Sequence, residues 1–140
     1  MKVAVTGASG LIGRALVEAL ERDGHEVRRL VRRPATAPDE VQWDPIGGSV
    51  DVDRLAGITA AVHLAGAGVG SRRWSSSYKR EIRDSRVLGT RTIARALAGL
   101  DPKPAVLVSG SAIGYYGDTG DRTVDEGAPP GEGFLAAVVR

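Results

Sequence analysis

The sequence has no cysteine, and its 140 residues include only two histidines, one phenylalanine and one methionine. Without cysteine the chain has neither a disulfide framework nor a thiolate nucleophile or metal ligand, which fits a reducing compartment. The two histidines, His25 and His63, do not bracket carboxylates at a metal-ligand spacing. We therefore predict no metal site.

Long apolar runs and a strong charge of one sign are also missing. No stretch is long enough to span a bilayer, and the apolar residues after Met1 are too few for a signal peptide. The 19 basic and 17 acidic side chains nearly balance. The arginines concentrate between Arg72 and Arg95, which we interpret as a solvated helix face or subunit interface, with a nucleic-acid-binding domain as the weaker alternative. These features predict a cytoplasmic protein with no nucleic-acid and no membrane partner.

What is present is an alternation of strand and helix patterns. The expected strands cover residues 2–6, 26–31, 41–43, 60–65 and 105–108, and the expected helices cover 11–23, 52–56 and 78–100. The runs at 60–65 and 105–108 are almost unbroken, as in central strands that are covered on both faces. The pattern predicts an α/β fold, a Rossmann-like doubly wound parallel sheet of about five strands in three α/β/α layers.

A glycine-rich turn joins the first expected strand to the first expected helix. Gly7 allows the sharp turn, Gly10 lets the backbone approach a pyrophosphate, and Gly13 permits close packing of helix on strand. An anion would bind to free N–H groups at the start of the helix. The candidate binding residues of this turn are Gly7, Ser9, Gly10, Leu11, Ile12 and Gly13. A turn that only connects strand to helix is the alternative.

The residues after the second strand indicate which dinucleotide is bound. An NAD site usually has Asp or Glu there, whereas this chain has Arg32 and Arg33, which favour the 2′-phosphate of NADP. Arg32 is the preferred ligand of the two because it comes first after the strand. Asp44 is a candidate for the adenine edge, and His63 is interpreted as a packed strand residue. The turn after the 60–65 strand adds three small or apolar candidates, Leu64, Ala65 and Gly66.

Several motifs in this order give the chain a family resemblance: TGASGLIG at 6–13, WDP at 43–45, HLAGAGVG at 63–70, SRVLGT at 85–90 and SGSAIGYYG at 109–117. The chain resembles the extended short-chain dehydrogenase/reductase superfamily, and more narrowly the atypical epimerase proteins of the NAD-dependent epimerase/dehydratase group. The resemblance implies an NAD(P)-binding Rossmann domain over 1–140, incomplete because members run to about twice this length. In that reading, 110–140 form a loop and the start of the next helix, and a homodimer is possible.

The same resemblance implies catalytic residues, and the chain departs from it at one point. Ser111 matches the serine that positions a substrate oxygen, but Phe134 and Val138 stand where a Tyr-x-x-x-Lys pair is expected. Tyr115 or Tyr116 is the replacement candidate for acid/base work. We expect an NADP-binding oxidoreductase or epimerase-like protein acting on a small hydroxylated or carbonyl substrate. The alternative is a non-catalytic NADP-binding regulatory or sensor module.

Overall fold

The computed structural model describes residues 1–140, which divide into two compact units, Met1–Ser109 and Gly110–Arg140. The first unit is built on one sheet, and its strands are β1 (Lys2–Thr6), β2 (Glu26–Val31), β3 (Glu40–Asp44), β4 (Ser49–Val50), β5 (Ala60–His63) and β6 (Val106–Ser109). Their order across the sheet is β4-β3-β2-β1-β5-β6. All neighbouring strands run parallel except β3 and β4. The predicted Rossmann-like α/β fold is therefore confirmed.

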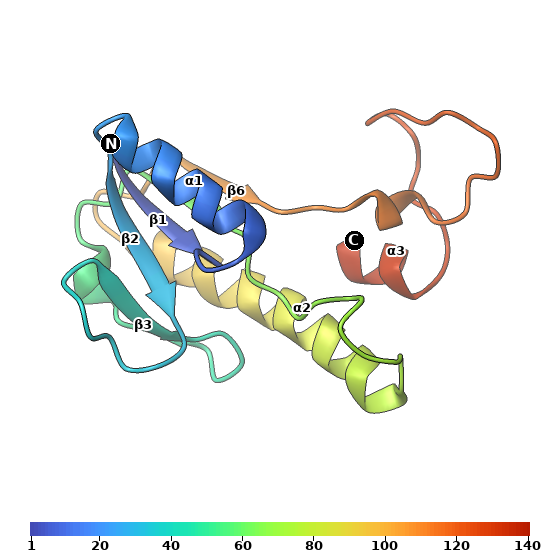
Figure 1. The fold of residues 1–140 in the computed structure, drawn as a ribbon, viewed down its shortest axis with the longest axis horizontal. Coiled ribbons are helices and arrows are strands. Elements are labelled where there is room, and N and C mark those ends of the chain that lie inside the picture. Colours follow the sequence, from blue (N-terminus) through green and yellow to red (C-terminus); the bar gives the residue numbers. More distant parts are fainter. The chain divides into compact units, whose positions relative to one another are not determined.

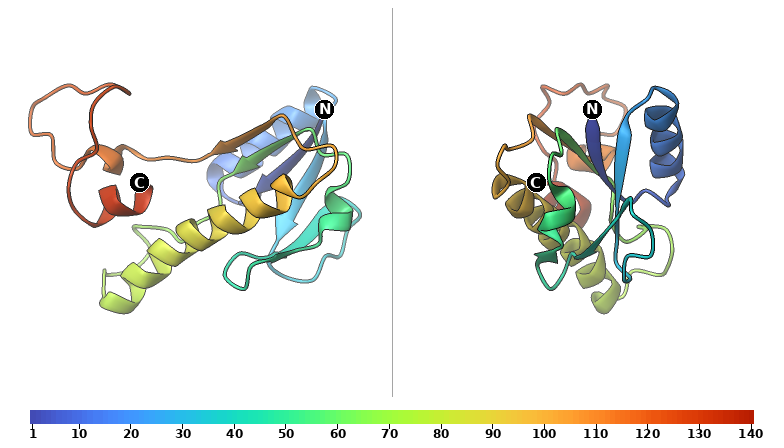
Figure 2. Two further views of the ribbon diagram at one scale, coloured as in Figure 1. Left: turned by 180° about the vertical axis from the view of Figure 1, so that it is seen from behind. Right: turned by 90° about the vertical axis from the view of Figure 1, so that its left-hand side faces the viewer.

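Helices cover both faces of this sheet (Figures 1 and 2). Helix α1 (Leu11–Arg22) lies on one face, and the long helix α2 (Ser76–Ala98) lies on the other together with the 3-10 turn η1 (Val52–Leu55). Each face has its own apolar cluster. Val17 of α1 packs with Val3, Val5 and Val27, whereas the opposite cluster contains Leu30, Val41, Trp43, Leu55, Ile58, Ile93 and Leu97.

Two sequence expectations about strands need correction. The sheet has six strands rather than about five, because Ser49 and Val50 form a two-residue antiparallel strand too short to show a period. β6 is not a central strand covered on both faces. It is the last strand of the order, and Val106 and Val108 are 48% and 53% exposed. An apolar run shows that a strand is suited to burial. Whether the strand is buried depends on the strands and helices that pack against it.

The buried face of α1 is also not the face that the apolar residues of the sequence predicted. Leu11 and Ile12 are largely exposed, while the buried residues of the helix are Gly13 and Val17. The helix ends as expected, with Gly24 at φ +77° just beyond it. α2 starts two residues earlier than predicted because Ser75 caps it, its side chain accepting a hydrogen bond from the Tyr78 N–H at 3.2 Å.

The second unit, Gly110–Arg140, contains the 3-10 turn η2 (Ile113–Tyr116) and the short helix α3 (Phe134–Val139). α3 forms where the sequence predicted the start of a helix. Leu135 packs beside Gly114, and the Gly131 N–H donates to the Tyr115 carbonyl at 2.9 Å. No helix of the chain is both long enough and apolar enough to cross a membrane.

Candidate functional site

The parallel strands bring the predicted cofactor residues to one edge of the sheet. Thr6 ends β1 and pairs in register with Leu30 of β2 and with His63 of β5. The chain continues from β1 to β2 on one side and, after β3 and β4, returns to β5 on the other side. Such a reversal leaves a crevice beyond the carboxyl ends of the strands, which is where open α/β sheets bind ligands.

The glycine turn lies at the centre of that edge. Gly7 has φ +70°. Its carbonyl accepts a hydrogen bond from the Gly10 N–H at 3.0 Å, which closes the turn. The first bond of α1 runs from the Arg14 N–H to the Gly10 carbonyl. The N–H groups between Gly10 and Arg14 therefore precede the intrahelical bonding and can receive an anion.

Three close approaches show why glycine is needed in this turn. A Cβ on Gly7 would lie 2.9 Å from both the Ala65 nitrogen and the Leu64 carbonyl carbon. A Cβ on Gly13 would collide with the Gly7 carbonyl oxygen and the Ala8 Cα. Gly10 is more open, at 3.3 Å from the Gly7 oxygen. The turn is thus pressed against the end of β5 on one side and against its own helix on the other.

The surface beside the turn is apolar and open. Leu11 and Ile12, in the first turn of α1, are 85% and 68% exposed, and Ser9 is also exposed. Large aliphatic side chains at such exposure are favourable only when something covers them. Leu11 and Ile12 thus form an apolar surface directly beside the free N–H groups. This combination fits a nucleotide, which has both anionic and apolar parts.

The two arginines after β2 have different partners. The guanidinium of Arg33 holds both carboxylate oxygens of Glu40, with its Nη1 donating to Oε2 at 2.8 Å and its Nη2 to Oε1 at 2.5 Å. It also donates to the Pro34 carbonyl and to Thr36 Oγ1. Arg32 is exposed, and neither a hydrogen bond nor an ion pair engages its side chain. Of the pair, only Arg32 has all of its donors available to a phosphate, because Arg33 uses both of its Nη groups on other partners.

The carboxylate of Glu40 is buried, with 5% of the residue exposed. The pKa of Glu40 is lowered from 4.5 to about 2, first because Arg33 donates to it and then because the Thr36 N–H does so at 2.9 Å. The same pairing raises the pKa of Arg33. This ion pair ties the segment after β2 to the start of β3, so it fixes the place from which Arg32 projects.

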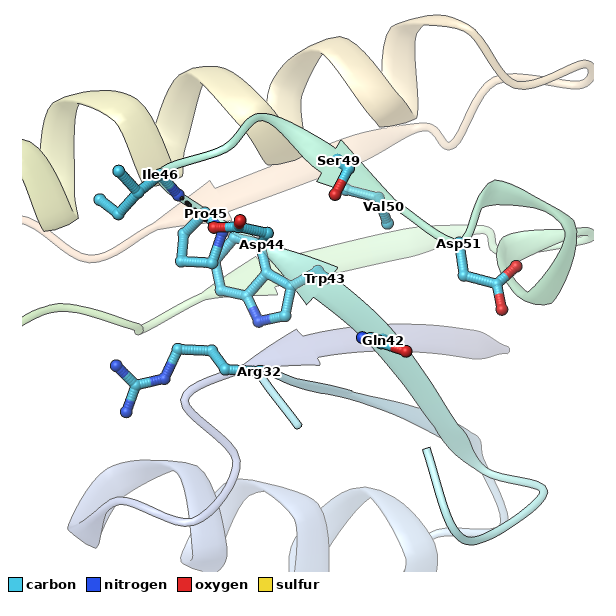
Figure 3. A pocket seen from close by; sticks show the side chains of 9 residues that line it. All are labelled: Arg32, Gln42, Trp43, Asp44, Pro45, Ile46, Ser49, Val50 and Asp51. Carbon is cyan, nitrogen blue, oxygen red and sulfur yellow. Dashed lines mark hydrogen bonds between the residues drawn. The ribbon is translucent and has the colours of Figure 1, made fainter. Parts of the chain in front are cut away.

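A hollow of about 440 Å³ opens next to Arg32 (Figure 3). Its lining comes from β3, β4, the turn between them and the residues that directly follow β2 and β4: Arg32, Gln42, Trp43, Asp44, Pro45, Ile46, Ser49, Val50 and Asp51. Figure 3 shows the Arg32 side chain extending beside the Asp44–Pro45 corner, with Asp51 at the far end of the hollow. Asp44 Oδ1 accepts from the N–H groups of Ile46 and Gly47 at 3.0 and 2.8 Å. Asp44 therefore ends β3 beside Arg32 and lines the hollow, and one of its oxygens shapes the turn.

A buried network joins the glycine turn to the end of β5. Thr6 Oγ1 accepts hydrogen bonds from the N–H groups of Leu64 and Ala65 at 3.1 and 3.2 Å, and it lies 2.7 Å from His63 Nδ1. Because the hydroxyl already accepts twice, its own proton points to Nδ1, and the neutral imidazole carries its proton on Nε2. The predicted cofactor residues Leu64 and Ala65 are thus fixed against β1, and the more exposed Gly66 follows them.

The His63 ring is packed as a strand residue, as the sequence predicted. It is 3% exposed and meets Trp43 edge-on with ring centroids 6.0 Å apart. Its Nε2 is buried without a hydrogen-bond partner. Burial lowers the pKa of His63 below 6.5, so the ring is neutral at physiological pH.

The predicted catalytic residues all lie in the second unit. Ser111 is exposed just before η2, and Tyr115 and Tyr116 are half-buried within it. The two tyrosine rings meet edge-on, with centroids 5.2 Å apart. Phe134 and Val138, at the positions of the expected Tyr and Lys, belong to α3.

Sequence reasoning missed the residues that support this edge. Thr6 and Glu40 each bond a candidate residue, and Ser85 and Arg86 bond Ala67, directly after the candidate Gly66, yet none of the four was singled out for that role. An acid seven residues after Arg33, at the start of the third strand, was the available signal for Glu40. No local pattern marks Thr6 or Arg86, whose partners after β5 are 19 to 59 residues away in the chain.

The sheet order, the three-glycine turn and the open edge beyond β1 define a Rossmann domain of the dinucleotide-binding type. Residues 3–135 match the NAD dependent epimerase/dehydratase family, and the chain belongs to that family. It is 44% identical over 134 residues to the epimerase family protein ML0860 of Mycobacterium leprae. That match covers 96% of this chain and 43% of the relative, so the chain spans less than half of the relative's length.

Solved structures agree with this assignment. The human epimerase family protein SDR39U1, crystallised with NADPH, superposes with a TM-score of 0.86 at 32% identity, covering 99% of this chain and 46% of that one. A nucleoside-diphosphate sugar epimerase from Corynebacterium glutamicum gives a TM-score of 0.83 at 40% identity, covering 99% and 28%. MoeE5 in complex with UDP-glucose and NAD gives 0.78 at 29% identity, covering 99% and 45%.

Proposed function

We propose that this chain binds NADPH across the carboxyl edge of its sheet. The observation that carries the choice of NADPH is the contrast between Arg32, whose donors are unengaged, and Arg33, which is held by Glu40. A guanidinium at the end of β2 can pair with a 2′-phosphate in a forked geometry, and no carboxylate stands at that point to accept from a ribose hydroxyl. The related human protein is described with NADPH, whereas the more distant MoeE5 is described with NAD.

Each part of the dinucleotide has a fitting partner in the first unit. The 2′-phosphate is assigned to Arg32 and the adenine to the hollow that includes Asp44. The pyrophosphate is assigned to the N–H groups between Gly10 and Arg14, and Leu11 and Ile12 would be covered by it and the adjoining ribose. The rest of the cofactor then reaches the Leu64–Gly66 turn, which the topology places on the other side of β1.

For the protein to which the chain belongs, we propose an oxidoreductase or epimerase activity on a small hydroxylated or carbonyl substrate. A nicotinamide ring supplies the capacity to accept or donate hydride. In this proposal Ser111 holds the substrate oxygen, and Tyr115 or Tyr116 moves the proton, because Phe134 and Val138 have no group that can do so. The alternative of a non-catalytic module rests only on those two residues, and no contact in the structure adds to it.

The test of cofactor choice is calorimetric titration with NADPH and, separately, with NADH. Wild-type protein is expected to bind NADPH more tightly than NADH. Arg32→Asp is expected to reduce this ratio of affinities at least tenfold, because one charge-assisted phosphate contact is worth about 1.5–3 kcal/mol. The matched control is Arg91→Ala, which removes an exposed arginine of α2. A folded wild-type protein that binds neither dinucleotide would refute the proposal.

The test of chemistry is NADPH oxidation in the presence of a panel of small aldehydes and ketones. Tyr115→Phe and Tyr116→Phe separate the two candidates, since each removes only a hydroxyl. One of them is expected to lose activity by about 100-fold or more while binding NADPH normally. If both variants keep wild-type rates on a substrate that the wild type reduces, neither tyrosine is the acid.

A further inference from the structure

The loop that follows β5 is exposed, yet its backbone is held by side chains of α2. The Ala67 N–H donates to Ser85 Oγ at 3.0 Å, and the Ala67 carbonyl accepts from Arg86 Nη1 at 2.9 Å. Consecutive residues of one helix thus bond both polar backbone groups of a single loop residue. These two contacts hold the two peptide units that flank the Ala67 Cα, 66–67 and 67–68.

The next two carbonyls of the loop are held in the same way. The Tyr78 hydroxyl donates to the Gly68 carbonyl, and Trp74 Nε1 donates to the Val69 carbonyl at 2.7 Å. Side chains from α2 and its approach therefore bond every carbonyl from Ala67 to Val69. This loop contains Gly66 and Gly68 and would otherwise have wide conformational freedom.

Arg86 contributes most specifically to this arrangement. It is half-buried, forms no ion pair with a carboxylate, and bonds the carbonyls of Ala67 and Ile82. A Cβ on Gly66 would lie 3.0 Å from its Cζ and 3.1 Å from its Nη1. The guanidinium therefore lies close to the Gly66 Cα, and a methyl group there would push it away by a few tenths of an ångström.

The place of this loop in the sheet indicates what it serves. Arg32 follows β2, the glycine turn follows β1, and the Gly66–Val69 loop follows β5, which is the order in which the strands lie side by side. A dinucleotide that has its 2′-phosphate on Arg32 and its pyrophosphate on the turn extends next over the end of β5. The adenosine half would then lie on the opposite side of β1 from this loop.

We propose that Arg86 is a positioning residue for the nicotinamide half of the dinucleotide, acting through the Gly66–Val69 loop with Ser85 as its partner. The inference rests on the proposed function, because it needs a dinucleotide bound in the direction described above. Preorganising the loop lowers the entropy that binding must otherwise remove. Arg86 therefore affects ligands that reach the loop and leaves shorter ligands unaffected.

The experiment compares two ligands, NADPH and 2′,5′-ADP, which carries the 2′-phosphate and adenosine but no nicotinamide. Arg86→Ala is expected to weaken NADPH binding on the order of tenfold or more while changing 2′,5′-ADP binding less than about twofold. Arg86→Lys keeps one donor for the Ala67 carbonyl and is expected to restore part of the loss. Arg91→Ala, on the same helix and exposed, is the control that should bind both ligands normally.

A second pair of variants tests the contact itself. Gly66→Ala should reproduce the loss of NADPH affinity, because its Cβ displaces the guanidinium, and adding Arg86→Ala to it should cost little more. Equal losses for NADPH and 2′,5′-ADP, or independent losses from the two substitutions, would overturn the inference. Unchanged NADPH binding by Arg86→Ala would also overturn the inference, but it would leave the proposed function intact. A wild-type protein that binds neither ligand overturns both.

Discussion

At the scale of single residues, the Thr6 hydroxyl joins the end of β1 to the end of β5. Thr6 Oγ1 is buried and bonds three groups at once, the two N–H groups of Leu64 and Ala65 and the ring of His63. Its loss would leave the Ala65 N–H without its acceptor and His63 Nδ1 without its donor. Each such buried, unsatisfied group costs about 1–3 kcal/mol.

Thr6→Val is therefore expected to lower the free energy of unfolding by at least about 2 kcal/mol, about 1 kcal/mol or more for each of the two groups, although the side chain keeps its shape. Thr6→Ser keeps the hydroxyl and is the matched control. Urea unfolding followed by fluorescence of the two tryptophans measures both variants. If the valine variant unfolds at the same urea concentration as the serine variant, the hydroxyl contributes nothing.

Arg32 and Arg33 show what the sequence could and could not predict about single residues. The sequence placed Arg32 and Arg33 together after a strand and preferred Arg32 because of its position. The structure supplies a different reason, namely that Glu40 holds Arg33. Charge and spacing cannot tell which of two adjacent guanidinium groups is paired, because the answer depends on how the 34–39 segment folds back to β3.

At the scale of elements, the sequence predicted what periodicity and glycine can specify. The bounds of α1 and β1 came out almost unchanged, because a strand, a three-glycine turn and a helix cap are local signals. The two-residue β4 and the exposure of β6 were not predictable, since both depend on which neighbours a strand meets. The loop contacts made by Ser85 and Arg86 are likewise tertiary, joining groups 18 and 19 residues apart.

The packing of α1 against the glycine turn gives a prediction at this scale. Gly13→Ala places a Cβ against the Gly7 carbonyl and Ala8, and neither backbone group can move without displacing the turn. The expected loss is about 1–3 kcal/mol of stability, as for other overpacked sites, together with loss of NADPH binding. Gly10→Ala meets only the Gly7 oxygen, at 3.3 Å, and should cost clearly less stability. Equal urea midpoints for the two variants would contradict this account of the packing.

At the scale of the whole molecule, two buried groups make stability depend on pH in the same direction. Burial lowers the pKa of His63 from 6.5, and Arg33 with Thr36 lowers the pKa of Glu40 from 4.5 to about 2. Below each ordinary value the unfolded chain binds a proton that the folded chain does not. The free energy of unfolding therefore falls as the pH is lowered.

The expected profile has two stages, which unfolding in urea at neutral pH, about pH 5.5 and about pH 4 would separate. The first decline begins below about pH 6.5 from His63, and a second begins below about pH 4.5 from Glu40. Glu40→Gln lowers stability at neutral pH by removing the ion pair with Arg33, and it should flatten only the second stage. Glu18→Gln, an exposed acid on α1, should leave both stages as they are. A second stage that persists unchanged without the Glu40 carboxylate would assign the acid sensitivity to other carboxylates of the fold.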